Sequence, residues 1–346
     1  MSINQNQRHL TMVTLHALTC EHFPNPLGID TPQPRLSWQL QSDRRGARQS
    51  AYLVQVTSNG ATLWDSEKVS SAQSLHIPYA GPALQPGQRC AWRVRVWDEN
   101  DEPSAWSTTA SWEMGLLDPA NWQADWITPD WDEDTTQPQP APMLRTEFML
   151  DGEIAEARLY ATSLGLYELH LNGHRVGDGQ LTPGWTSYQQ RVQYQTYDVT
   201  HLLQAGDNAL GALLGDGWYR GYLGFQNQRN LYGDQLALLC QLTVTYRNGR
   251  TQTITSNDAW KATTGPLRMT DLYWGEEYDA RLEKPGLAIA GYDDRDWAGA
   301  RVLDHAKSIV VAQRGPFVKR QEELRPQRIF QSPKGETILD FGQNMV

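Results

Sequence analysis

The sequence predicts an all-β protein built from two or three antiparallel sandwiches. Long helical periodicity is nearly absent, whereas short segments of alternating apolar and polar residues recur between clusters of Gly, Pro, Asn and Asp. Such alternation is typical of strands that are joined by turns. The chain has 346 residues, which is too long for one ordinary sandwich and suits two or three.

A polar leader comes first. Residues 1–14 lack the apolar stretch of a signal peptide. The three cysteines, Cys20, Cys90 and Cys240, lie far apart and match no metal-binding spacing. They indicate free thiols in a reducing compartment, so we expect a cytoplasmic protein.

Residues 15–115 predict a first sandwich of about seven short strands, similar to an immunoglobulin or fibronectin type III domain. In the segment 91–97, Trp92, Val94 and Val96 share one face of a strand. Residues 116–142 follow as a linker that three tryptophans punctuate. Its acidic, proline-rich end indicates solvated chain and not a metal site.

Residues 143–310 predict a second, larger β unit. The Asn172-Gly173 pair is a strong signal for a hairpin with a type I′ turn, and 247–250 (RNGR) is a second such signal. His170 and His174 have a spacing that could chelate a metal on a helix, but a hairpin and the lack of an evident third ligand argue against it.

Residues 311–346 predict the start of a third sandwich. The segment 336–341 (ETILDF) has the pattern of a strand. So few strands cannot close a sandwich, so we expect the other strands to lie downstream or to be missing.

The composition excludes several partners. The formal net charge is −10, whereas nucleic acid binding needs a basic stripe, and no apolar run approaches the roughly 20 residues of a membrane span. We therefore expect neither nucleic acid nor a membrane as a partner. Fourteen Trp and fourteen Tyr suit sugar contact as well as protein cores, because each ring has an apolar face and a polar edge.

A glycine-rich cluster at 215–225 (GDGWYRGYLGF) is the first candidate site. It follows an apolar strand at 208–214, so its side chains would project from a loop at a strand end. Asp216, Trp218, Tyr219 and Arg220 offer a carboxylate, aromatic plates and a guanidinium, which together suit a sugar. The alternative is that Trp218 and Tyr219 belong to the core and Asp216 caps a turn.

A second cluster at 271–281 (DLYWGEEYDAR) holds four carboxylates and three aromatic residues. Three interpretations stay open: a Ca²⁺ site, a carboxylate pair for glycoside hydrolysis, and a salt-bridge network among Glu276, Asp279 and Arg281. A third cluster around Trp185 forms either a wall of the same loop face or a strand start with a buried indole.

No motif for cofactor or serine chemistry is present. The sequence lacks a Gly-x-Ser-x-Gly elbow, a His-Glu-x-x-His helix, a P-loop and a dinucleotide fingerprint. Six segments instead resemble, in the correct order, the α-L-rhamnosidases of glycoside hydrolase family 78. They are 25–38 (NPLGIDTPQPRLSW), 92–98 (WRVRVWD), 183–188 (PGWTSY), 215–219 (GDGWY), 275–281 (GEEYDAR) and 340–344 (DFGQN).

The resemblance implies that the second unit is a jelly-roll, similar to galactose-binding domains. In some family members this module is a carbohydrate-binding module that holds L-rhamnose with the help of Ca²⁺. From the residue types in the clusters, we expect a sugar to contact a loop face that is built from both clusters. The candidate contacts are Asp216, Trp218, Tyr219, Arg220, Trp185 and Glu276, and the candidate calcium ligands are Glu277 and Asp279. The family's catalytic acids lie in an (α/α)₆ barrel downstream, so no residue of this chain inherits a catalytic role.

The leading hypothesis is an N-terminal accessory region of an α-L-rhamnosidase, inactive alone. Its expected partners are a rhamnosyl glycoside or oligosaccharide and the downstream catalytic domain. One alternative is a self-sufficient hydrolase that uses Glu276, Glu277 or Asp279. The other is a structural module without a ligand.

Overall fold

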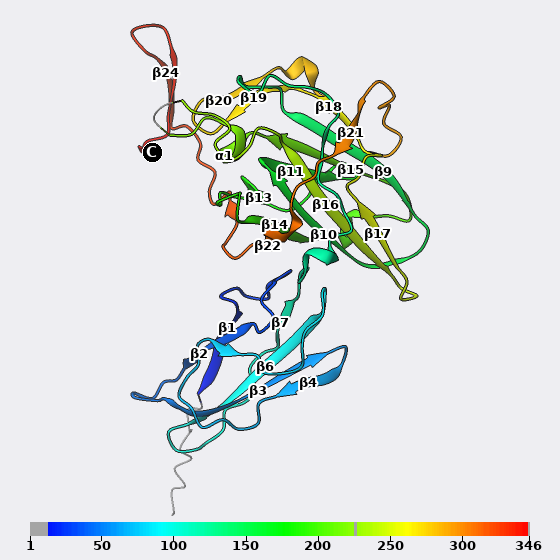
Figure 1. The fold of residues 1–346 in the computed structure, drawn as a ribbon. Helices are drawn as coiled ribbons and strands as arrows, with labels where there is room; N and C mark the ends of the chain where they lie inside the picture. The colour runs from blue at the N-terminus through cyan, green and yellow to red at the C-terminus, as the bar shows by residue number, and fades with distance from the viewer. Residues whose placement is uncertain (1–12, 225–226, 345–346) are drawn as a thin grey trace, which may run out of the picture.

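The computed structural model describes residues 13–224 and 227–344 and contains two β-sandwiches placed end to end, followed by a C-terminal segment (Figure 1). Most of the predicted leader, residues 1–12, lies outside the described residues, as does Phe225 of the glycine-rich cluster. Thr14 differs from the leader prediction because it already begins the first strand. Within the described residues no helix is long and apolar enough to cross a membrane.

The first sandwich has the seven strands that the sequence predicts. Residues of β6 alternate as expected, with Trp92, Val94 and Val96 buried and Arg93 exposed. Trp38 and Trp112 fill the same core. One sheet contains β1 (Thr14–Cys20), β2 (Arg35–Gln41) and β5 (Ile77–Pro78), and the other contains β4 (Ala61–Asp65), β3 (Gln49–Ser58), β6 (Arg89–Asp98) and β7 (Ala110–Glu113).

The predicted linker is part of the second sandwich. After a short 3₁₀ turn at Pro119–Asn121, Trp122 and Trp126 are 5% and 1% exposed and belong to the core of the second unit. Strand β8 (Ile127–Pro129) then pairs with β16 (Ala237–Tyr246) and β21 (Ala298–Val302) of that unit. Indole rings bury large apolar areas, so the gain from covering them outweighs the preference of this polar segment for solvent.

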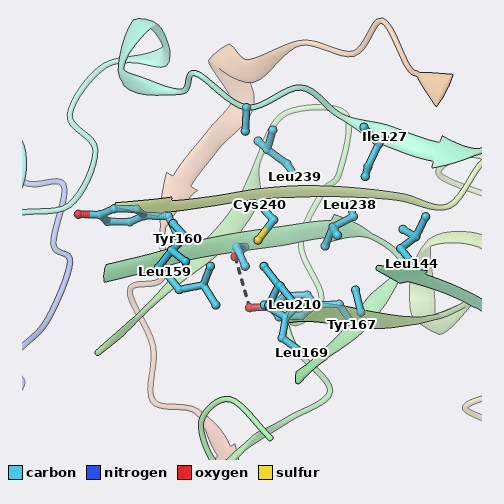
Figure 2. Close-up of a cluster of buried hydrophobic side chains, with 14 of the residues drawn as sticks. Ile127, Leu144, Leu159, Tyr160, Tyr167, Leu169, Leu210, Leu238, Leu239 and Cys240 are labelled. Atoms are coloured by element: carbon cyan, nitrogen blue, oxygen red, sulfur yellow. Dashed lines mark hydrogen bonds between the residues drawn. The ribbon is translucent and has the colours of Figure 1, made fainter. Parts of the chain in front are cut away.

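Twelve strands form the wrapped sheet of the second sandwich. Its core gathers side chains from β10, β11, β15 and β16 (Figure 2), among them Leu159, Tyr167, Leu210 and Leu238. Besides β8, the strands are β9 (Pro142–Leu150), β10 (Ile154–Leu164), β11 (Leu166–Leu171), β12 (His174–Arg175), β14 (Val192–Asp198), β15 (Gly206–Gly215), β16 (Ala237–Tyr246), β17 (Thr251–Thr255), β18 (Lys261–Thr264), β21 (Ala298–Val302) and β22 (Val310–Ala312).

Both predicted hairpins are present. Asn172 and Gly173 have φ values of 50° and 81°, as a type I′ turn between β11 and β12 requires. Residues 247–250 connect β16 to β17, with Gly249 at φ 83°. His170 lies on the first hairpin with Nε2 2.7 Å from Glu168. This contact is the largest cause that lowers the pKa of Glu168 to about 2.

The C-terminal segment first pairs with strands of the second sandwich and then forms a separate hairpin. Strand β22 runs parallel to β14, so the third unit does not begin at residue 311 as the sequence predicts. Strand β23 (Val318–Lys319) pairs with β13 (Gly179–Gln180). Strands β24 (Arg328–Gln331) and β25 (Thr337–Asp340) form a separate hairpin, and β25 confirms the predicted strand at 336–341.

The two sandwiches meet at a joint of paired charges. Arg158 of β10 donates from Nε and Nη2 to the carboxylate of Glu113 on β7, at 2.7 and 2.9 Å. The side chains of Arg158 and Glu113 are 6% and 7% exposed. Arg89, which is 55% exposed, donates to the same carboxylate at 2.7 Å and to Glu156 at 2.5 Å.

Close backbone contact accompanies these charges. The backbone N–H of Leu116 donates to the Tyr194 hydroxyl at 2.8 Å. A Cβ atom at Gly115 would lie 2.2 Å from that hydroxyl, so glycine is required there. On the other side of the joint, the N–H of Ala312 donates to Asp30 of the first sandwich at 3.0 Å. The joint therefore holds the sandwiches at several points.

Candidate functional site

The glycine-rich cluster forms a sharp turn at the end of β15. Gly217 has φ 53°, and a Cβ atom there would lie 2.6 Å from Cγ of Leu166. The chain turns at this glycine into a single helical turn, α1 (Gly217–Arg220). It lies at the end of the second sandwich that is far from the first (Figure 1).

Asp216 and Arg220 do not project from this loop, contrary to the sequence prediction. They are 2% and 1% exposed. Oδ1 of Asp216 accepts from Nε of Arg220 at 2.7 Å, and Oδ2 accepts from Arg229 at 3.0 Å. Arg220 also pairs with Glu133. Burial raises the pKa of the Asp216 carboxyl, and the two guanidiniums oppose that shift. The carboxylate and guanidinium therefore hold the loop in place and offer no surface to a sugar in this structure.

Tyr219 belongs to the core. It is 6% exposed, and its ring meets the edge of Tyr188 at a centroid distance of 5.2 Å. This is the alternative that the sequence left open for Tyr219. The side chain supports the turn from below and is not part of the loop surface.

Trp185 and Trp218 form an indole plate. Their rings are stacked at 5.8 Å with an interplanar angle of 5°. Trp218 is half-buried, whereas Trp185 is 51% exposed and its Nε1 donates to the Tyr232 hydroxyl at 3.1 Å. Trp185 is therefore not a buried strand residue, and the plate presents a flat aromatic surface beside α1.

The second cluster folds against the first. Strands β19 (Leu267–Asp271) and β20 (Gly275–Tyr278) form a hairpin. The N–H of Asp216 donates to Oγ1 of Thr270 at 3.0 Å, and the N–H of Tyr222 donates to Oδ2 of Asp271 at 2.7 Å. The structure thus brings together two segments that are about sixty residues apart in the sequence, at one end of the module.

The three carboxylates beyond this turn do not converge. Glu276 and Glu277 are exposed on β20. Asp279 accepts from Nε and Nη2 of Arg281 at 2.8 and 2.6 Å, and these hydrogen bonds lower the pKa of Asp279. Asp279 and Arg281 thus form part of the predicted salt-bridge network, without Glu276. Within the described residues no group of three or more His, Cys, Asp or Glu side chains is arranged to hold a metal ion.

Several residues that shape this end were given no role of their own from the sequence. Oδ1 of Asp271 accepts from the N–H groups of Tyr273 and Trp274 at 2.8 and 2.9 Å. This local turn has a readable signal, since Asp favours hydrogen bonds to N–H groups two residues on. Glu133 and Arg229 could not be found in this way, because their partners lie 87 and 13 residues away.

Two family models match most of the chain. The description "Rha78A-like, N-terminal immunoglobulin domain" matches residues 15–118, and "Alpha-L-rhamnosidase N-terminal domain" matches residues 152–322. A curated α-L-rhamnosidase from Alteromonas sp. (strain LOR) is 38% identical over 94% of this chain and 37% of its own length. The chain spans 37% to 48% of the length of the curated relatives that it matches.

Solved structures have the same fold. The α-L-rhamnosidase of Aspergillus terreus superposes with a TM-score of 0.91 at 38% identity, covering 96% of this chain and 39% of the other. The Streptomyces avermitilis α-L-rhamnosidase, solved in complex with L-rhamnose, gives 0.90 at 30% identity, covering 96% and 49%. The sequence match to a curated Streptomyces avermitilis α-L-rhamnosidase runs over 499 residues, so that relative has extra residues within the matched span.

Proposed function

The chain belongs to the α-L-rhamnosidases of glycoside hydrolase family 78, whose N-terminal part it matches, and we propose that it serves such an enzyme as an accessory region. The whole enzyme would hydrolyse terminal α-L-rhamnosyl residues. Within the described residues the longest helix is the four-residue α1, so a helical catalytic barrel is not among them. The first sandwich would act as a support, and the second would carry the contact surface.

The observation that carries this proposal is the match of two N-terminal domain models in chain order over an all-β fold. The test is turnover of an aryl α-L-rhamnoside by the purified chain. We expect none. Turnover that disappears on Glu276→Gln or Asp279→Asn substitution would favour the self-sufficient hydrolase, and turnover unaffected by both would also overturn the accessory role.

We further propose that the indole plate contacts a rhamnosyl group. The specific observation is that the Trp185 ring remains 51% exposed while it stacks on Trp218, because flat aromatic rings suit the C–H faces and methyl group of such a sugar. Glu276 is exposed on β20 and is the carboxylate we assign to a sugar hydroxyl. Few atoms of a monosaccharide would make contact, so the affinity would be weak.

Calorimetry with L-rhamnose tests the plate. We expect heat of binding at millimolar sugar, its loss in Trp185→Ala, and its retention in Trp297→Ala, a half-exposed indole that packs on Tyr292 instead. No heat from the folded chain, with calcium present, would leave the structural module as the surviving alternative.

Glu277 and Asp279 are the carboxylates that we assign to a calcium ion. A Ca²⁺ ion held by Glu277 and Asp279 would compete with Arg281 for the Asp279 carboxylate, so we expect calcium to act only if that ion pair opens. Loss of sugar binding on addition of chelator would support a role for calcium.

We also propose a reducing compartment such as the cytoplasm, because Cys20, Cys90 and Cys240 are buried and unpaired.

A further inference from the structure

The C-terminal hairpin exposes apolar side chains on both of its faces. Ile329 lies opposite Leu339, and Phe330 lies opposite Ile338. These residues are 66%, 51%, 42% and 37% exposed in that order. Successive residues of a strand point to opposite faces, so each face of the hairpin carries one apolar pair. Strands that are apolar on both faces are typical of sheet interiors, and a two-stranded hairpin alone is marginally stable.

The β19–β20 turn displays a second apolar surface, which we call the tip: Tyr273 and Trp274. They are 66% and 59% exposed. The tip is held firmly, because Asp271 binds the N–H groups of both residues and the Trp274 ring meets Tyr222 at 6.0 Å. Large exposed rings on a fixed turn are typical of interaction surfaces. Glu276 and Glu277 follow after Gly275 and are exposed, so the strand that leaves the tip carries negative charge.

The connection between the two surfaces is short. Strand β23 ends at Lys319, which pairs with Gly179 of the second sandwich, and β24 begins at Arg328. The eight residues between them reach at most about 30 Å when fully extended. Any module that takes the hairpin into its sheet must therefore lie within about 30 Å of the end of β23. The hairpin projects from the end that carries the tip, away from the first sandwich (Figure 1).

We propose that the tip is the seat of the part of a rhamnosidase chain that follows β24–β25. That part would cover both faces of the hairpin and bury Trp274 and Tyr273, with basic residues toward Glu277. The inference rests on the proposed accessory role, since the curated relatives are more than twice as long as this chain's match to them. It does not depend on sugar contact at the indole plate.

A chimera tests this seat. Residues 1–346 would replace the matched region of the Alteromonas sp. enzyme, with Trp274→Cys introduced and maleimide labelling measured without sugar. The three cysteines of this chain are buried, and peptide mass mapping restricts the measurement to position 274, so thiols of the Alteromonas part do not contribute. We expect labelling at position 274 to be at least tenfold slower in the chimera than in the 346-residue chain. Arg295→Cys, whose parent side chain is 86% exposed on another loop, should label equally in both.

Hydrogen exchange of the same chimera provides a second measurement. The amides of β24 and β25 should be protected in the chimera and not in the chain alone. Protection at both places supports the seat, whether or not the plate binds rhamnose. Equal labelling at position 274 in chimera and chain overturns the proposal, even if the hairpin is protected. Unprotected hairpin amides overturn it as well. An inactive chimera that meets both criteria still supports the seat, because neither readout uses turnover.

Discussion

The two ends of the second sandwich differ in how completely they are covered. At the joint, Arg158 and Glu113 are nearly buried and hydrogen-bonded to each other across two modules. At the opposite end, Trp185, Tyr273 and Trp274 are more than half exposed. A surface that is packed against its partner is buried and hydrogen-bonded, as the joint is. Large rings exposed on a fixed turn are typical of a surface that binds another module.

The ion pairs at the joint and the exposed ion pairs at the far end also differ in how much they contribute to stability. A buried ion pair is strongly destabilising to break, because the remaining charge loses its compensation. Exposed pairs such as Asp279 and Arg281 contribute little. The joint should therefore contribute strongly to the stability of the chain, and the exposed residues of the far end should tolerate substitution.

The largest effect should come from breaking the joint. Arg158→Ala leaves the Glu113 carboxylate buried with one remaining cation, so we expect a loss of about 3–5 kcal/mol in the free energy of unfolding. Arg89→Ala removes a half-exposed partner of the same carboxylate and should cost less than about 1 kcal/mol. Chemical denaturation of both variants measures this. Equal losses would mean that the joint does not differ from a surface contact.

A smaller loss in the free energy of unfolding is expected at the far end. There a buried carboxylate can be compared with one whose partner is exposed. Asp216→Asn removes the charge that two buried guanidiniums share, and we expect a loss of about 2–3 kcal/mol. The control is Asp279→Asn, whose partner Arg281 is 88% exposed and whose loss of stability should be much smaller, because solvent screens the pair. If Asp216→Asn unfolds no more easily than Asp279→Asn, the buried cluster does not support the loop.

The hairpin that carries Glu168 should make the stability of the folded chain depend on pH. Its folded-state pKa is lowered from the usual 4.5 to about 2, first by His170 and then by Arg175. The stabilisation is therefore fully present above the unfolded pKa and is lost as the pH falls from about 4.5 toward 2. Because Glu168 is 38% exposed, solvent limits the effect to less than about 1 kcal/mol. Thermal unfolding of Glu168→Gln should depend less on pH in this window, and an unchanged pH profile would contradict the assignment.

The smallest effect should come from the tip. Trp274→Ser removes a ring that is 59% exposed, and we expect the free energy of unfolding to change by less than about 0.5 kcal/mol. The matched substitution Trp126→Ala removes a ring that is 1% exposed and should cost about 3–5 kcal/mol. A large loss at Trp274 would show that the tip serves this chain's own fold and not a partner.

Local signals allowed most of the fold to be predicted. The Asn172-Gly173 turn, the alternation in β6 and the strand at Thr337–Asp340 each depend on neighbouring residues, and the structure has all three. The prediction of a linker at residues 116–142 was wrong because Trp122 and Trp126 are covered by strands that lie far away in sequence. Neither hydropathy nor composition indicates which distant strand will cover an indole.

The site was less predictable for the same reason. Asp216 and Arg220 looked like loop residues with polar heads, but their burial depends on Glu133 and Arg229, which the sequence does not connect to them. The sequence left open whether Trp185 shares a loop face with Trp218, and it did not predict that the two indoles stack. Residue types indicated candidate contacts in the loop, whereas long-range pairing decided which side chains reach its surface.

Hydrogen exchange along the 346-residue chain tests most directly the claim that one end is closed and the other open. The account predicts slow exchange for the amides of β10 beside the joint, and exchange near the rate of an unfolded peptide for β24 and β25. Protection of the hairpin comparable with that of β10 would contradict it, because the hairpin would then already have its partner within this chain.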